Sequence, residues 1–228
     1  MNMSKSILNC IKMDIDTLKE LLLKIRIQLR KQQKEKWNRS LSFEEELFDR
    51  WERAKFLGFG TGTSIHQSSM VYGDVKVGKD TWIGPYTILD GSGGLEIGDN
   101  CSISTGVQIY SHDSVEKRVS DRRAKVTRDK TTIDNSCYIG PMAVIRKGIT
   151  ISNNSIIGAY SYVNKSVSPY TIVAGIPAKK IGKLKVNDKG QVEYIYKKEK
   201  DKFLANEKEI DKLKKKIEEL EKRIKKDE

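Results

Sequence analysis

The stretch from residue 131 to residue 163 reads TTIDNSCYIGPMAVIRKGITISNNSIIGAYSYV. An aliphatic residue returns at every sixth position of this stretch, at Ile133, Ile139, Ile145, Ile151, Ile157 and Val163. A period of six fits neither an α-helix nor a simple alternating strand. It is typical of a solenoid, in which each short repeat buries its apolar side chain only by stacking on its neighbours.

The same spacing extends towards the N-terminus. It includes Ile65, Val71, Val77, Ile83 and Leu89 and, after a slip of two residues, Ile97, Ile103 and Ile109. A glycine often follows the aliphatic residue, as at Gly84 and Gly140, and we expect it to permit a tight corner. Three hexads per turn would make residues 63–182 a mainly β, triangular coil.

The flanking segments have a different character. Residues 1–62 are expected to be helical, with one amphipathic helix to about residue 36 and a second over 40–56, where Ser42 and Glu45 form a capping box. Residues 183–196 are expected to be a linker. Residues 197–228 place apolar side chains at heptad spacing and predict a coiled coil that self-associates or docks to a partner.

Composition and charge limit the partners and the cellular location that we expect. The net charge is +12, but much of the excess lies in terminal segments where lysines alternate with glutamates, which is typical of solvated helical faces. We therefore expect no nucleic-acid partner, while an attraction to small anions or to an anionic membrane surface stays open. No membrane span is expected, because no run of about 18 apolar residues occurs. The unclustered Cys10, Cys101 and Cys137 indicate reduced thiols and a cytoplasmic protein.

One interruption breaks the hexads, and a histidine stands at its edge. Ile133 resumes the spacing four hexads after Ile109, so residues 113–131 form a loop, which is strongly basic. Loops of this length in compact domains are usually functional or disordered. His112 could act as a general base, since the unperturbed pKa of histidine is about 6.5. His66 has no comparable context and is expected to be structural or at the surface.

The hexads of the form I-G-x-x-x-x, the loop with its histidine and the ending VAGIPAKKI at 173–181 occur in a specific order. In this order they resemble the hexapeptide-repeat acyltransferases, and most of all the galactoside, maltose and polysaccharide-sugar O-acetyltransferases. The resemblance implies a left-handed parallel β-helix that forms homotrimers, with acyl-CoA in the cleft between subunits. It also implies direct transfer from acetyl-CoA without a metal.

The resemblance assigns roles to individual residues. His112 is expected to be the catalytic base. Contacts to the acceptor are expected from Asp90, Tyr110, Ser111 and Asp113. Contacts to CoA are expected from Tyr138, Pro141, Ala159, Asn164, Lys179 and Lys183. The galactoside and maltose enzymes carry an asparagine where this chain has Ile83, so their sugar contacts do not carry over.

The function predicted is acetyl transfer to a sugar hydroxyl, in surface polysaccharide or glycan assembly. N-acetylation of an amino sugar or sugar nucleotide is the nearest alternative, because the same histidine would serve both acceptors. Inactivation of an antibiotic is a weaker alternative. A non-catalytic β-helix scaffold is the alternative from another class.

Overall fold

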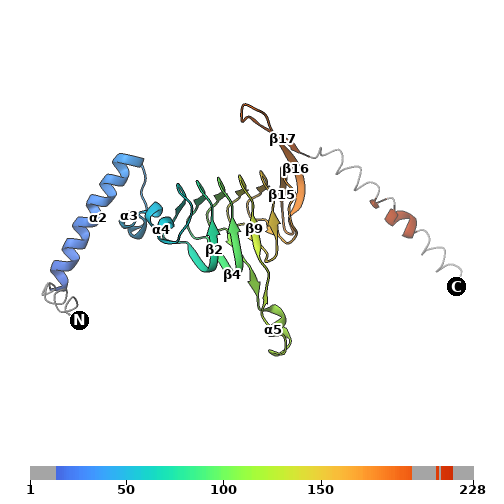
Figure 1. Ribbon diagram of the computed structural model, residues 1–228, viewed down its shortest axis with the longest axis horizontal. Helices are drawn as coiled ribbons and strands as arrows, with labels where there is room; N and C mark the ends of the chain where they lie inside the picture. The colour runs from blue at the N-terminus through green and yellow to red at the C-terminus, as the bar shows by residue number, and fades with distance from the viewer. Residues whose placement is uncertain (1–13, 197–208, 211, 218–228) are drawn as a thin grey trace.

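The computed structural model describes residues 14–196, 209–210 and 212–217. Its centre is a parallel β-solenoid with three faces (Figure 1). The N-terminal helices lie at one end of the solenoid, and an antiparallel hairpin lies at the other. No helix in these residues combines the length and the apolar character needed to cross a bilayer.

The solenoid strands are short, and each pairs with the strand one turn away. The first face consists of β1 (Ser64–Ile65), β3 (Trp82–Ile83), β5 (Ser102–Ile103), β10 (Tyr138–Ile139), β13 (Ile156–Ile157) and β15 (Thr171–Ala174). The second and third faces consist of β2 (Met70–Val77), β4 (Ile88–Ile97), β6 (Gln108–Ile109), β9 (Thr131–Ile133), β11 (Val144–Ile145), β12 (Thr150–Ile151) and β14 (Tyr162–Val163). The long strands β2 and β4 run across the corner between the second and third faces.

The hexad residues form three internal columns, one behind each face. Strand pairing stacks Ile65, Ile83, Ile103, Ile139, Ile157 and Val173 in the first column. It stacks Val71, Leu89, Ile109, Ile145 and Val163 in the second, and Val77, Ile97, Ile133, Ile151 and Val167 in the third. Nearly all of these side chains are buried. The predicted solenoid with three hexads per turn is confirmed.

The glycines after the hexad residues serve close approach between coils. Asn135 Oδ1 accepts a hydrogen bond from the Asp99 amide at 2.8 Å, and Asn153 Oδ1 accepts one from the Asn135 amide at 2.9 Å. A Cβ on Gly98 would lie 2.2 Å from Asn135 Oδ1. At Gly140 a Cβ would meet the backbone of the next coil at 2.7 Å. Glycine is therefore needed at these positions mainly because a side chain would clash with the next coil, and less because of the shape of the corner itself.

A second ladder runs inside one corner of the prism and includes two cysteines. Thr81 Oγ1 donates to the Gly98 carbonyl at 2.9 Å, and Ser155 Oγ donates to the Ser168 carbonyl at 3.0 Å. At the equivalent positions, Cys101 Sγ lies 3.1 Å from the Asp134 carbonyl and Cys137 Sγ lies 3.3 Å from the Ser152 carbonyl. Both thiols are free and buried. They act as small core residues with a weak donor.

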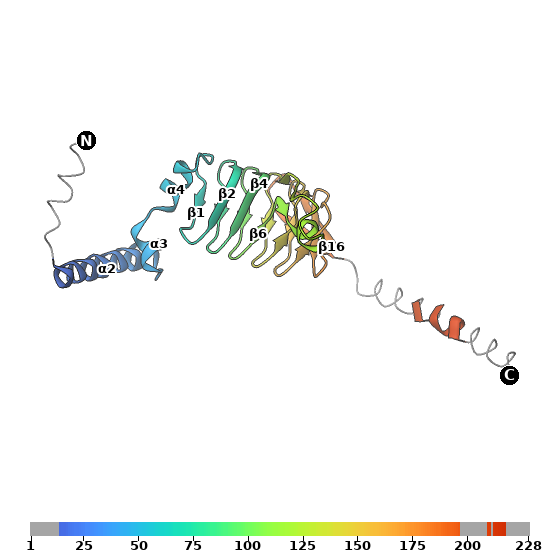
Figure 2. The same cartoon turned by 90° about the horizontal axis from the view of Figure 1, so that it is seen from below.

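The N-terminal region contains three described helices. Helix α2 (Ile15–Trp37) begins at Asp14, whose carboxylate accepts from the amides of Asp16 and Thr17. None of its residues is buried, and it stands away from the solenoid (Figure 2).

The predicted helix over 40–56 is two helices, α3 (Phe43–Leu47) and α4 (Arg50–Phe56). They are separate because Asp49 caps α4 by accepting from the amides of Trp51 and Glu52. The predicted capping box is wrong, since Ser42 makes no side-chain cap and Glu45 turns towards His66 and Ser68 instead.

Residues 183–196 differ from the expected linker. Strand β16 (Lys179–Val186) pairs antiparallel with β15, and β17 (Val192–Tyr196) pairs with β16, which extends the first face. The lysines of β16 alternate with Leu184, which is buried, and a Cβ on Gly182 would lie 2.7 Å from the Ile195 carbonyl. Of the predicted coiled coil, residues 209–210 and 212–217 are helical, and the rest lies outside the described residues.

Candidate active site

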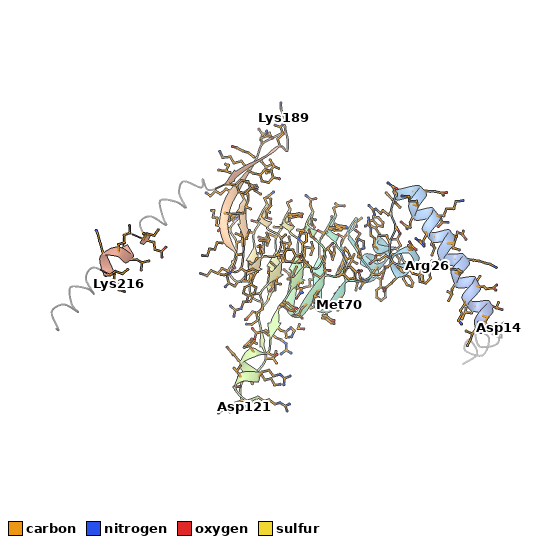
Figure 3. The ribbon with its side chains drawn as sticks, turned by 180° about the vertical axis from the view of Figure 1, so that it is seen from behind. Asp14, Arg26, Met70, Asp121, Lys189 and Lys216 are labelled. Carbon is orange, nitrogen blue, oxygen red and sulfur yellow. The ribbon has the colours of Figure 1, made fainter. Side chains whose placement is uncertain are left out.

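His112 lies where the chain leaves the solenoid. The chain turns out of the second face after β6 and forms β7 (His112–Asp113), which pairs antiparallel with β8 (Thr127–Arg128). Between them the loop carries helix α5 (Val115–Val119) and extends to Asp121 at its far tip (Figure 3). The β7–β8 pair anchors His112 at the base of this excursion.

The imidazole of His112 is held by a buried carboxylate. Its Nδ1 lies 2.5 Å from Oδ2 of Asp90, whose side chain is 3% exposed, whereas that of His112 is 38% exposed. Asp90 Oδ2 also accepts from the Ser111 amide at 3.0 Å, and Oδ1 accepts from the Ser92 amide at 3.0 Å. Both carboxylate oxygens are therefore occupied, and only the histidine of this pair faces solvent.

The ionisation of Asp90 determines which ring nitrogen of His112 carries a proton. Burial alone would raise the pKa of Asp90, but hydrogen bonds from Ser92, the Ser111 amide and His112 outweigh burial and lower the pKa to about 2. At neutral pH Asp90 is thus an ionised group that can only accept hydrogen bonds. Nδ1 of His112 must therefore donate to Asp90, so Nε2 is the nitrogen that can carry a lone pair towards the cleft. Nε2 makes no hydrogen bond within the described residues.

A two-residue insertion in β4 creates this arrangement. Val71 pairs with Leu89 and Val77 pairs with Ile97, so β4 uses two more residues than β2 between the second and third faces. The extra residues form a bulge at Ser92–Gly94, where the Gly93 amide donates to Ser111 Oγ at 2.8 Å. A Cβ on Gly93 would lie 2.3 Å from the Ser111 carbonyl. The bulge therefore packs directly beneath the segment that carries His112.

His112 borders a cleft of about 630 Å³ between the second face and the loop. Tyr110 and Tyr162 contribute aromatic walls, and Arg146 and Asp113 contribute charge. Lys147 forms an ion pair with Asp129 at one end of the loop and lies 3.7 Å from Asp113 at the other. The hydrogen bond with Asp129 is the main cause of the raised pKa of Lys147. This lysine ties the two ends of the loop together beside His112.

The four residues expected to contact the acceptor fall into two groups. Tyr110 and Asp113 line the cleft. Asp90 and Ser111 are buried, with Asp90 turned onto His112 and Ser111 bound to the bulge, so neither faces an acceptor. The expectation for these two is corrected, because their polar atoms are used in holding the histidine. Leu89 pairs across the sheet with Ile109, which places Asp90 beside the segment that leads to His112, so hexad counting alone contains a signal for this pairing.

The residues expected to contact CoA are also divided. Asn164 and Lys179 line a second groove of about 480 Å³, together with Lys165 and Lys180. This groove adjoins the His112 cleft, because the Ala178 amide donates to the carbonyl of Tyr162, a cleft residue, at 2.8 Å.

The other four residues expected to contact CoA lie elsewhere. Tyr138, Pro141 and Ala159 lie on the first face or at its corner with the second, and none lines either cavity. Lys183 lies on β16, opposite Thr171. Among the residues that the structure describes, no three His, Cys, Asp or Glu side chains are grouped so as to hold a metal ion.

The repeats match known proteins. The family model described as "Bacterial transferase hexapeptide (six repeats)" matches residues 130–165. Galactoside O-acetyltransferase from Escherichia coli (strain K12) is 30% identical over 131 residues, which cover 58% of this chain and 60% of that protein. The chain belongs to the hexapeptide-repeat acyltransferase family.

Two further proteins are similar over different lengths. Chloramphenicol acetyltransferase from Klebsiella aerogenes is 49% identical over 53 residues, which cover 23% of this chain and 25% of that enzyme. A variant of AntD, an N-acyltransferase from Bacillus cereus, crystallised with dTDP and coenzyme A, has a TM-score of 0.50. It is 21% identical, and the match covers 71% of this chain and 95% of that one. The chain thus spans 60% and 25% of the length of the two curated relatives, in both cases less than two thirds.

Proposed function

We propose that this protein is an acetyl-CoA-dependent acetyltransferase that transfers the acetyl group directly to a sugar hydroxyl. The observation that carries the proposal is the pairing of Asp90 with His112 at the edge of an open cleft. A buried carboxylate that fixes the tautomer of a half-exposed histidine is the arrangement a general base requires. The similarity to galactoside O-acetyltransferase supports the choice of reaction.

The geometry suggests the following sequence of proton transfers. Nε2 of neutral His112 accepts the proton of the acceptor hydroxyl as its oxygen attacks the thioester carbonyl. The new C–O bond forms, the C–S bond breaks, and the CoA sulfur takes the proton back from the imidazolium. The ionised Asp90 stabilises that imidazolium and holds the ring in place throughout.

The groove beside the cleft is the proposed route for CoA. Asn164 and Lys179 line it, as the family resemblance implies, and Lys165 and Lys180 add positive charge suited to phosphate groups. With the acetyl thioester at His112, the nucleotide end of CoA would extend along this groove. The use of acetyl-CoA as donor supports the proposal of a cytoplasmic enzyme.

We propose that the chain forms the homotrimer that the resemblance implies. Tyr86, Met142 and Tyr160 are exposed at the corner between the first and second faces, and Tyr138 is exposed beside them. Side chains of this kind are suited to a subunit interface. In such a trimer, Tyr138, Pro141, Ala159 and Lys183 would reach a CoA molecule held in a cleft shared with a neighbour.

Thiol release from acetyl-CoA, measured with sugars, amino sugars and sugar nucleotides as acceptors, tests the proposal. His112→Ala should lower turnover roughly 100-fold to 10,000-fold, the usual contribution of a general base. His66→Gln removes the other histidine of the chain, which lies outside the cleft, and should leave turnover largely intact. Wild-type protein that releases no thiol with any acceptor would contradict the proposal. The best acceptor distinguishes a hydroxyl from an amine.

A further inference from the structure

A third cavity lies far from His112, where the N-terminal helices meet the first coil. It encloses about 240 Å³ between the end of α2, the α3–α4 segment and His66. Figure 1 places these helices at the end of the solenoid opposite the β16–β17 hairpin. The cleft and the groove described above share no lining residue with this cavity.

Three cationic side chains line this cavity, and aromatic rings hold them. The guanidinium of Arg50 lies 4.2 Å from the ring centre of Trp51, and its Nη1 lies 3.4 Å from His66 Nε2. The guanidinium of Arg39 and the ammonium of Lys36 lie 5.5 Å and 5.2 Å from the ring centre of Trp37. Stacking of this kind fixes the direction of each charged group without neutralising it.

The carboxylates of the cavity are bound to other groups. Glu45 Oε2 lies 2.9 Å from His66 Nδ1, and Glu45 Oε1 accepts from the amide and the hydroxyl of Ser68. Asp49 Oδ1 accepts the two amides that begin α4. Across residues 14–196, no carboxylate lies within ion-pair distance of Lys36, Arg39 or Arg50. Burial, and then the charge of Arg39, lower the pKa of Arg50, and the charges of Asp49 and Glu45 offset this lowering only in part.

We propose that this cavity binds a phosphate-type anion between Arg39 and Arg50, with Lys36 at its rim. A planar guanidinium offers two parallel N–H donors that match the oxygens of phosphate or sulfate, and two such groups facing one cavity create an anion site. Arg39 lies in the segment between α2 and α3, and Arg50 opens α4. A bound anion would therefore join the exit of α2 to the helix that packs on the first coil.

The tryptophans of the chain provide a direct measurement. All three lie at this end of the molecule, since Trp37 and Trp51 line the cavity and the Trp82 ring centre lies 6.0 Å from that of His66. Intrinsic fluorescence of the full chain can be followed during titration with inorganic phosphate at constant ionic strength, with chloride as the reference anion. A parallel titration with glycerol phosphate tests for a phosphoryl group that belongs to a larger molecule. Neither titration contains CoA, so the result does not depend on acetyl transfer.

We expect a saturable, phosphate-specific change that Arg39→Gln and Arg50→Gln each weaken at least tenfold. Arg26→Gln is the matched control, because it removes the same charge from an exposed position further along α2 (Figure 3) and should not alter binding. If Arg50→Gln fails to fold, the test rests on Arg39→Gln, which should fold because Arg39 is exposed. Tighter binding of glycerol phosphate than of phosphate would identify an organic phosphate as the ligand. The proposal is overturned if neither compound binds below about 10 mM, or if Arg39→Gln binds as the wild type does.

Discussion

Asp90 and His112 are 22 residues apart in the chain, yet Oδ2 of Asp90 lies 2.5 Å from Nδ1 of His112. The pair forms because coils of the solenoid stack and because the bulge in β4 directs Asp90 under the loop base. The carboxylate is buried and the imidazole is half-exposed, so the pair has one interior and one exposed end. In the proposed reaction, Asp90 would therefore position the ring and His112 would transfer the proton.

Replacing Asp90 with asparagine should reduce turnover at least 100-fold, because an amide can offer Nδ1 a donor and favour the wrong tautomer. The KM for acetyl-CoA should change little, since Asp90 does not line the proposed CoA groove. Steady-state kinetics of Asp90→Asn measure both effects. Asp74→Asn is the control, as it removes an exposed acid from the neighbouring strand β2. Equal kcat values for Asp90→Asn and wild type would exclude a positioning role.

Ionised Asp90 should also stabilise the fold, and this stabilisation should be lost in acid. Its pKa is about 2 in the folded state against 3.8 ordinarily, so the folded state binds this proton less readily than the unfolded state. The resulting stabilisation, roughly 2 kcal/mol, is present above pH 4 and is lost as pH falls towards 2. Urea unfolding between pH 2 and pH 5 should show a steeper loss for the wild type than for Asp90→Asn. Parallel curves would mean that the carboxylate gains nothing from its hydrogen bonds.

Two glycine substitutions should separate stability from catalysis. A Cβ at Gly93 meets the Ser111 carbonyl at 2.3 Å, and a Cβ at Gly98 meets Asn135 Oδ1 at 2.2 Å. Gly93→Ala and Gly98→Ala should each cost about 1–3 kcal/mol through overpacking. Only Gly93→Ala should also displace His112 and lower kcat in the protein that remains folded. Similar kcat values for the two variants would show that the bulge does not position the histidine.

The hydrogen bonds of the ladder predict which substitutions Cys101 tolerates. Cys101→Ser keeps a donor near the Asp134 carbonyl and matches Thr81 and Ser155 in the same ladder, so it should change stability by less than about 1 kcal/mol. Cys101→Val removes the donor and adds bulk to a packed core, so it should cost more. Denaturant unfolding of the two variants checks the order. The reverse order would indicate a purely apolar site.

His66 should make the fold less stable in mild acid. Burial lowers its pKa below the ordinary 6.5, an effect that Glu45 only partly offsets. The stabilisation is therefore complete above pH 6.5 and declines as pH falls through the folded pKa. Thermal unfolding from pH 7.5 to pH 5 should show this decline in the wild type and a weaker one in His66→Gln. A decline of equal size in both would place the responsible group elsewhere.

Hexad spacing was sufficient to predict the solenoid because a column of identical positions leaves a periodic trace in the chain. The spacing also indicates where His112 lies, because the loop that follows it interrupts the repeats by a whole number of hexads. The contact of Asp90 with His112 is not predictable from the neighbouring sequence, because a carboxylate beside a glycine cluster is equally typical of a surface turn. The buried carboxylate of Asp90 accepts hydrogen bonds from the amides of Ser92 and Ser111, which come from different coils. The β16–β17 hairpin was missed because the lysines that alternate with Leu184 resemble a solvated linker.

An uninterrupted turn of the solenoid, such as the one from Ile139 to Ile157, takes 18 residues and adds a fixed length to the molecule. Ile139 stacks on Ile157 and Ile145 stacks on Val163, so each added turn lengthens the molecule by one strand spacing, about 4.8 Å. His112 and Lys179 stand at different heights along this axis, and the number of turns between them sets the length of any reagent that touches both. Duplicating residues 139–156 would move Lys179, together with Tyr162 of the cleft, away from His112 by one strand spacing. The distance between two sites on the solenoid is therefore set by the number of turns between them, in steps of one strand spacing.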